Sequence, residues 1–264
     1  MKKYRKKRVK KYNKFFSYKN ADRAKRNFSY KNFGYSRSYN TKFTGSLFYG
    51  NYFNKACMKY CGFNGCKFRF IEFKNTNFRG SRFKGAVFEN VLFDNCNLEN
   101  ADFHGAEFRN VYYSNTSLKK TRGISSPETL KRLSKHSAKV DLGENLVKAI
   151  LHCKKNKYIL ESDTLFYKEK DRLSNAKKRE LKELPKAERK RLQRQRQIEA
   201  TEKSWMINRV NIIRLLDVYL EDEIANGLHL AADSIDKSFN SLSYFLPYIR
   251  KARENIEGGN KNEG

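Results

Sequence analysis

A large apolar side chain, most often phenylalanine, recurs at every fifth position over much of the first half of the chain. An amphipathic helix repeats such residues at intervals of three and four, and a half-buried strand repeats them at intervals of two. A spacing of five fits neither element. Two positions before each large residue the side chain is mostly small, with Asn51 and Ile71 as the larger exceptions. One large and one small inward side chain in every five residues predicts a solenoid, in which the other three positions face outward or turn a corner.

The frame is unbroken through sixteen repeats, and its large residues are Phe43, Phe48, Phe53, Met58, Phe63, Phe68, Phe73, Phe78, Phe83, Phe88, Phe93, Leu98, Phe103, Phe108, Tyr113 and Leu118. Motifs such as Ala101-Asp102-Phe103-His104-Gly105 resemble the pentapeptide-repeat family. The resemblance implies a right-handed quadrilateral β-helix with four pentapeptides in each coil, so residues 20 apart should stack. Two columns have this spacing: Gly45, Gly65, Gly85 and Gly105, and Asn75, Asn95 and Asn115. Glycine suits a turn with unusual dihedral angles, and stacked asparagine amides can hydrogen-bond along a column.

We expect the β-helix to span residues 28–120 and to be regular from residue 43, after a basic aromatic arm at residues 1–27. Phe28 and Phe33 keep the frame, but their small positions are basic and Ser38 takes the next large position. The early stretch should therefore form either a frayed first coil or a cover for the solenoid edge, because an open edge must be protected from pairing.

Beyond residue 120 the apolar spacing becomes helical, and we expect residues 121–257 to form a basic α-helical domain with a disordered tail at residues 258–264. The segment Ser126-Pro127-Glu128 has the pattern of a helix start. The widest apolar stripe runs from Trp205 to Ile224, and Gly227 is expected to end that helix.

The formal net charge is +29, and the excess of bases is concentrated in three places. Residues 1–27 hold 13 bases and one acid, interleaved with aromatic residues. One corner of the solenoid gathers Lys42, Lys59, Arg79, Arg82 and Lys84, and a later helix carries Lys177, Lys178, Arg179, Arg189, Lys190, Arg191, Arg194 and Arg196. Bases release counterions from a phosphate backbone and aromatic rings stack on unpaired nucleobases, so these elements are candidates for contact with nucleic acid. An acidic membrane surface or an acidic protein would attract the same charges.

A second candidate surface is apolar. Two outward columns place apolar side chains where solvent is expected, at Leu47, Tyr49, Tyr52, Val87, Leu92 and Tyr112. Such a patch could receive the helices of the same chain, which is the simpler interpretation, or a second subunit.

No motif in the sequence indicates catalysis, a cofactor or a metal site. A phosphate-cradling glycine loop and an H-E-x-x-H motif are both absent, and the four histidines are scattered. Cys61, Cys66 and Cys96 fall at the small inward position and no C-x-x-C pair occurs, so we expect packed, reduced thiols. The N-terminus has no apolar signal and no run of 18 apolar residues exists, which favours a cytoplasmic protein.

Two functions of different classes are compatible with these features. The first is a non-enzymatic binding module that presents its basic elements to a polyanion, most plausibly nucleic acid. The alternative is a scaffold that uses apolar surfaces to bind a protein partner or to form a homodimer. The family resemblance also brings in DNA-mimicking proteins that bind a type II topoisomerase. That role fits less well, because a DNA mimic needs acidic faces and the first coils here are basic.

Overall fold

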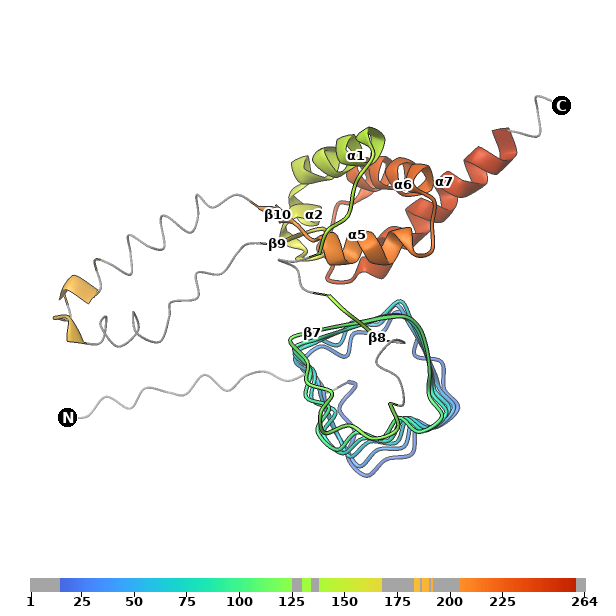
Figure 1. Cartoon of the computed structure of the whole chain (residues 1–264), viewed down its shortest axis with the longest axis vertical. Helices are drawn as coiled ribbons and strands as arrows, with labels where there is room; N and C mark the ends of the chain where they lie inside the picture. Colours follow the sequence, from blue (N-terminus) through green and yellow to red (C-terminus); the bar gives the residue numbers. More distant parts are fainter. Residues whose placement is uncertain are drawn as a thin grey trace.

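The structure is a computed structural model that describes residues 15–124, 130–133, 138–167, 183–185, 187–189, 191 and 205–259. A β-solenoid of about five turns is followed by a helical unit that lies against one of its faces (Figure 1). Figure 1 looks along the solenoid, so that successive coils superpose as a four-sided outline.

The coil length is 20 residues, as the glycine and asparagine columns predict. Parallel pairing joins Phe48 to Phe68, Phe68 to Phe88 and Phe88 to Phe108. Isolated bridges extend the same register back to Lys19, which pairs with Tyr39. The strands are β1 (Arg37–Tyr39), β2 (Leu47–Tyr49), β3 (Cys57–Lys59), β4 (Lys67–Arg69), β5 (Glu72–Lys74), β6 (Val87–Asp94), β7 (Glu107–Ser114) and β8 (Leu130–Arg132).

Columns of phenylalanine rings fill the interior. The rings of Phe43, Phe63, Phe83 and Phe103 follow one another at centroid distances of 5.0, 5.1 and 4.9 Å, with interplanar angles of 3°, 7° and 8°. This spacing matches the separation of neighbouring strands, so each ring stacks on the ring of the next coil. A fully buried phenylalanine contributes about 1.5–3 kcal/mol. The five-residue period therefore exists because each side of each coil must supply one ring to a column.

Small inward residues link consecutive coils. The hydroxyl groups of Thr76 and Ser81 donate to the carbonyl oxygens of Phe53 and Met58, both at 2.6 Å and both 23 residues earlier. The Asn51 amide makes the same bond to the carbonyl 23 residues before it. A polar inward side chain is tolerated here because this bond satisfies it.

The corners take the left-handed backbone conformation. Gly45, Gly65, Gly85 and Gly105 have φ between +62° and +68°, which confirms the reason for the glycine column. The asparagine column is bonded only in part, because Asn95 Nδ2 donates to Asn75 Oδ1 at 2.7 Å whereas the next asparagine bonds to its own neighbour Ser114.

The residues before position 43 form a coil. Phe28, Phe33 and Ser38 are all buried, and the Phe16 ring lies 4.7 Å from the Phe33 ring. Of the two alternatives left open by the sequence, the first coil is therefore the one observed, and Phe16 packs on its outer end.

The helical unit follows β8. Its elements are α1 (Glu144–Lys155), α2 (Lys157–Glu161), β9 (Phe166–Tyr167), β10 (Met206–Ile207), α5 (Arg209–Leu216), α6 (Glu221–Ser234), the 3-10 helix η2 (Leu242–Phe245) and α7 (Leu246–Gly259). Helices α1, α6 and α7 pack together around a core that includes Leu146, Ile150, Ile224, Leu228 and Ile249. No helix among the described residues is both long enough and apolar enough to span a bilayer.

Three local predictions in this region need correction or comment. The expected helix start at Ser126-Pro127-Glu128 lies outside the described residues, and the helix expected to follow it is not present at Leu130–Arg132, which form β8. The stripe from Trp205 to Ile224 is not one helix, and Gly227 does not end it. Gly227 lies inside α6, where an added Cβ would come within 2.5 Å of the Ile249 backbone. It allows α6 and α7 to approach closely. The expected disordered tail begins inside α7 at residue 258, and residues 260–264 lie outside the described part.

Candidate functional site

One of the two outward apolar columns, the one that contains Leu92 and Tyr112, faces the helical unit. Leu92 and Tyr112 are each 1% exposed and pack with Val210 of α5. Tyr49 packs against the helical core, and the Arg250 guanidinium of α7 lies 5.8 Å above its ring. The other three predicted interface residues, Leu47, Tyr52 and Val87, are half-buried. Half of this patch, namely Tyr49, Leu92 and Tyr112, is thus occupied within the chain.

A buried charged cluster lies at the centre of the contact between the solenoid and the helices. The Arg214 guanidinium of α5 is fully buried and donates to Glu72 Oε1 at 3.1 Å and to the Asn90 carbonyl at 2.9 Å. Asn90 Nδ2 donates back to the Arg214 carbonyl at 2.9 Å. Lys74 Nζ lies 2.9 Å from Glu72 Oε2 and also donates to the Asp163 carbonyl. These bonds fix α5 on the face formed by β5 and β6.

The cluster is ionised. Burial by itself would raise the pKa of Glu72, but Lys74 and Arg214 outweigh burial and lower that pKa to about 2. Burial would lower the pKa of Lys74, and the attraction of Glu72 raises it above its ordinary value. Burial lowers the pKa of Arg214 although Glu72 opposes that shift. Two cations therefore share one buried carboxylate, and each side chain depends on the others for compensation.

The cluster was missed at the sequence level, yet two signals mark it. Arg214 and Asn211 interrupt an otherwise apolar run in α5. Glu72 is the first acid after Asp22 and stands in a column whose other members are Tyr52, Leu92 and Tyr112. A charge on each of two apolar surfaces is the pattern of a buried ion pair between them.

The predicted cationic corner divides into paired and unpaired bases. Arg79 lies 3.6 Å from Glu99, and Lys84 lies 3.6 Å from Asp102. By contrast, Lys42, Lys59 and Arg82 form no ion pair with any acid that the structure describes.

Lys42 and Arg82 belong to one column. Parallel bridges connect Asp22, Lys42, Gly62, Arg82 and Asp102 in consecutive coils. Gly62 has no side chain, so the column has a gap between the two cations. A pocket of about 190 Å³ occupies this place and is lined by Asn20, Ala21, Asp22, Asn40, Thr41, Lys42, Tyr60, Gly62 and Arg82. We refer to it as the Gly62 notch.

The basic helix predicted around residues 177–196 lies mostly outside the described residues, namely Lys177, Lys178, Arg179, Lys190, Arg194 and Arg196. Of its described members, Arg189 donates to the Leu184 carbonyl at 3.0 Å and Arg191 is exposed. Most of the basic arm also lies outside the described residues, because the structure describes the chain only from residue 15.

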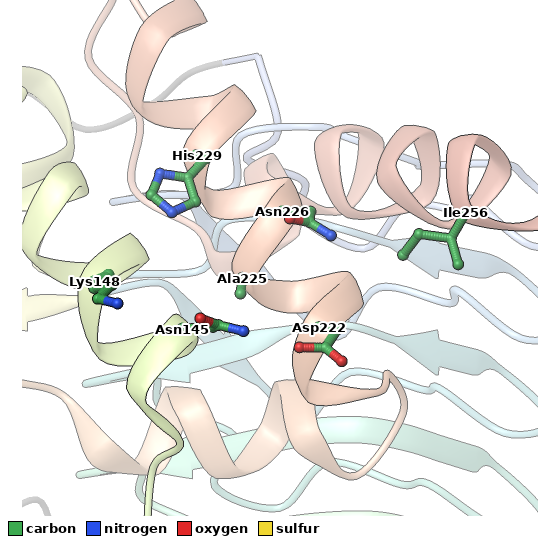
Figure 2. A pocket seen from close by; sticks show the side chains of 7 residues that line it. All are labelled: Asn145, Lys148, Asp222, Ala225, Asn226, His229 and Ile256. Atoms are coloured by element: carbon green, nitrogen blue, oxygen red, sulfur yellow. The ribbon is translucent and has the colours of Figure 1, made fainter. Parts of the chain in front are cut away.

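A second pocket, of about 520 Å³, lies between helices of the helical unit (Figure 2). Figure 2 shows Asn145 and Lys148 of α1 facing Asp222, Asn226 and His229 of α6. Beside it, His229 Nδ1 lies 3.0 Å from His152 Nδ1, and His152 Nε2 lies 3.2 Å from Asp233. The contact between the two imidazole rings joins α1 to α6. Among the residues that the structure describes, no group of three or more His, Cys, Asp or Glu side chains could hold a metal ion.

The inward cysteines are buried free thiols. Burial raises the pKa of Cys61, Cys66 and Cys153 to about 12 and raises that of Cys96 as well. Thiols with such pKa values are protonated at neutral pH and unreactive. Cys57 is the one partly exposed cysteine.

One family model matches part of the solenoid. Residues 71–110 match the model of the pentapeptide repeats, in eight copies. No curated protein matched the chain. Matching solved structures include a pentapeptide-repeat protein from the Arabidopsis thaliana thylakoid lumen, at 16% identity and a TM-score of 0.24, over 52% of this chain and 77% of that chain. Rfr23 of the cyanobacterium Cyanothece 51142 matches at 14% identity and a TM-score of 0.14, over 39% and 88% of the two chains. The plasmid-mediated fluoroquinolone resistance protein QnrB1 matches at 10% identity and a TM-score of 0.17, over 46% and 84%.

Proposed function

We propose, from the match of residues 71–110 to the pentapeptide repeats, that the chain is a non-enzymatic binding module whose basic first coils bind nucleic acid. The observation that carries the proposal is the charge of residues 15–64, which hold nine bases and one acid, Asp22. Lys25, Lys31 and Lys42 are exposed and make no ion pair with any described acid. A phosphate backbone can approach these side chains without displacing an acidic partner.

The later coils differ, because most of their bases are paired with acids. Arg69 binds Glu89 at 2.9 Å, Lys120 binds Glu99 at 2.9 Å, and Arg109 binds Glu107 at 2.7 Å. Positive charge is therefore uncompensated at the N-terminal end of the rod and largely compensated at the other end. Residues 1–14 add nine further bases and no acid in the sequence.

The protein-scaffold alternative has less support. Half of the apolar patch that suggested it is covered by α5 and α7 of the same chain. The uncompensated first coils likewise disfavour a DNA mimic, since a mimic must present negative charge.

The proposal is tested by a salt titration of binding to labelled duplex DNA, single-stranded DNA and structured RNA. One variant replaces Lys25, Lys31, Lys42 and Lys59 with Gln. The matched control replaces Lys119, Lys139, Lys154 and Lys155, which are exposed and lie outside residues 15–64. If the first coils hold the phosphates, the first variant should lower the slope of log K against log salt by about 3, because each phosphate contact contributes about 0.7–0.9.

The control variant should keep most of that slope, although it loses the same charge. Equal losses in the two variants would show attraction to charge in general and would overturn the assignment to the first coils. An absence of binding to all three nucleic acids at low salt would overturn the function itself.

A further inference from the structure

Tyr60 has a backbone conformation that its side chain does not favour. Its φ is +57°, in a column where the other left-handed residues are Asn20, Asn40, Gly80 and Asn100. Asparagine and glycine adopt this conformation readily, whereas a bulky side chain rarely does. The corners of this solenoid adopt it in coil after coil, and at position 60 the corner carries an exposed aromatic side chain.

The Tyr60 ring is placed by its neighbours and remains accessible. It lies flat on Gly80 of the next coil, where an added Cβ would come within 2.5 Å of Tyr60 Cδ1. The Tyr39 ring meets it edge to face at 5.5 Å and 72°. Even so, Tyr60 is 43% exposed and Tyr39 is 48% exposed. The result is a supported aromatic pair with open surface.

The Gly62 notch lies directly beside this pair, and Tyr60 forms part of its lining. A Cβ on Gly62 would have only Arg82 Nη2 at 3.8 Å and Thr44 Oγ1 at 4.0 Å as neighbours, so the space above it is open. At about 190 Å³ the notch is smaller than pockets for drug-sized ligands and has room for a single small group.

The chemistry of the notch suits one nucleotide. Lys42 and Arg82 are exposed on either side of Gly62, and their side chains make no hydrogen bond or ion pair within the described part of the chain. Asn40 Nδ2 donates to Asn20 Oδ1 at 3.1 Å, which leaves further amide groups for a polar ligand edge. Asp22 is the one acid in the lining, and its Oδ1 accepts from the Ala24 backbone at 2.9 Å.

We propose that the Gly62 notch and the Tyr39–Tyr60 pair form a binding site for one unpaired nucleotide of single-stranded nucleic acid. This inference rests on the proposed function and specifies its ligand. The base stacks on the exposed aromatic pair, and the phosphate lies between Lys42 and Arg82, nearer Arg82 because Asp22 repels it at the other end. A duplex keeps its base faces inside the helical stack, so this site discriminates in favour of single strands.

The central variant is Tyr60→Asn, since Asn occupies the equivalent corner at positions 40 and 100 and should leave the coil folded. Binding of the full chain to a labelled oligothymidylate and to a duplex of equal length is measured by fluorescence anisotropy. Because Tyr60→Asn removes the stacking of one base, the affinity for the single strand should fall about tenfold. The affinity for the duplex should change less than twofold. Tyr35→Asn is the matched control, because Tyr35 has φ +58° and is 42% exposed at another corner.

A second pair of variants tests the notch without touching the rings. Gly62→Glu places a carboxylate between the two cations and should reduce single-strand affinity about tenfold, by lost phosphate contacts. Gly62→Ala adds only a methyl group at ordinary contact distances and should bind as the original chain does.

The outcomes separate the two proposals. If Tyr60→Asn and Tyr35→Asn behave alike, or if Gly62→Glu binds the single strand normally, the nucleotide site is wrong even though the four-lysine variant still loses its salt slope. If neither oligonucleotide binds the original chain, the proposed function falls, and the nucleotide site falls with it.

Discussion

Glu72 supplies the negative charge on which two buried cations depend, Arg214 from α5 and Lys74 from its own strand. Removing one partner of a buried ion pair leaves an uncompensated charge, whereas an exposed pair contributes little. We therefore expect Glu72→Gln to lower the free energy of unfolding by about 3–5 kcal/mol in urea titrations. Glu89→Gln, which breaks the exposed Arg69–Glu89 pair, should cost less than about 1 kcal/mol. Similar losses in the two variants would contradict the structural role of Glu72.

The same carboxylate predicts a dependence of stability on acid. The folded-state pKa of Glu72 is about 2, below the ordinary value of 4.5. A depressed pKa stabilises the fold fully above the unfolded-state pKa, and this contribution disappears as the pH falls through the folded-state pKa. The stability difference between the original chain and Glu72→Gln should thus be constant above about pH 5 and shrink towards pH 2. A difference that stays constant down to pH 2 would show that Glu72 is not held ionised.

At the scale of elements, the solenoid could be predicted from sequence because each coil repeats the same local requirement. Phe63 needs a ring 20 residues away on either side, and Phe43 and Phe83 supply it. The first coil was less certain because Ser38 occupies a position that normally holds a ring, yet its hydroxyl accepts from the Tyr18 backbone at 3.2 Å. The five-residue spacing identifies the positions of the rings, but it cannot predict the hydrogen bond between Ser38 and the Tyr18 backbone.

The helical unit has no such repeat, and its boundaries depend on single polar contacts. The apolar stripe from Trp205 to Ile224 continues across a break between α5 and α6. The break occurs because Glu223 Oε2 accepts from the Leu220 backbone at 3.0 Å, which caps the start of α6. The pairing of Arg214 with Glu72 joins residues 142 positions apart, and no spacing rule predicts a contact at that distance. The Gly62 notch could not be predicted from the sequence either, because its importance depends on knowing that Lys42 and Arg82 lie on either side of Gly62.

At the scale of the whole molecule, the buried cluster ties the helical unit to the face of the rod. Hydrogen bonds from Arg214, Asn90 and Lys74 cross this contact, and Leu242 N donates to Glu72 Oε1 at 3.3 Å from the other side. Separating the two units would expose these charges with incomplete partners. The rod and the helices should therefore unfold together.

The reactivity of the buried thiols reports the unfolding of both units, because each unit contains at least one of them. Cys61, Cys66 and Cys96 lie inside the solenoid, and Cys153 lies in the helical core. In the native chain at pH 8 we expect one thiol, Cys57, to react rapidly with a disulfide reagent, since burial holds the pKa of Cys61 and Cys153 near 12. In urea the four buried thiols should become reactive in a single transition. Cys57→Ser should remove the rapid phase, and Cys153→Ser should remove one quarter of the later amplitude. If Cys153 became reactive at a lower urea concentration than the solenoid thiols, the helices would detach before the rod unfolds. In that case, if the buried cluster joins the two units, Glu72→Gln should increase the difference in urea concentration between the two transitions.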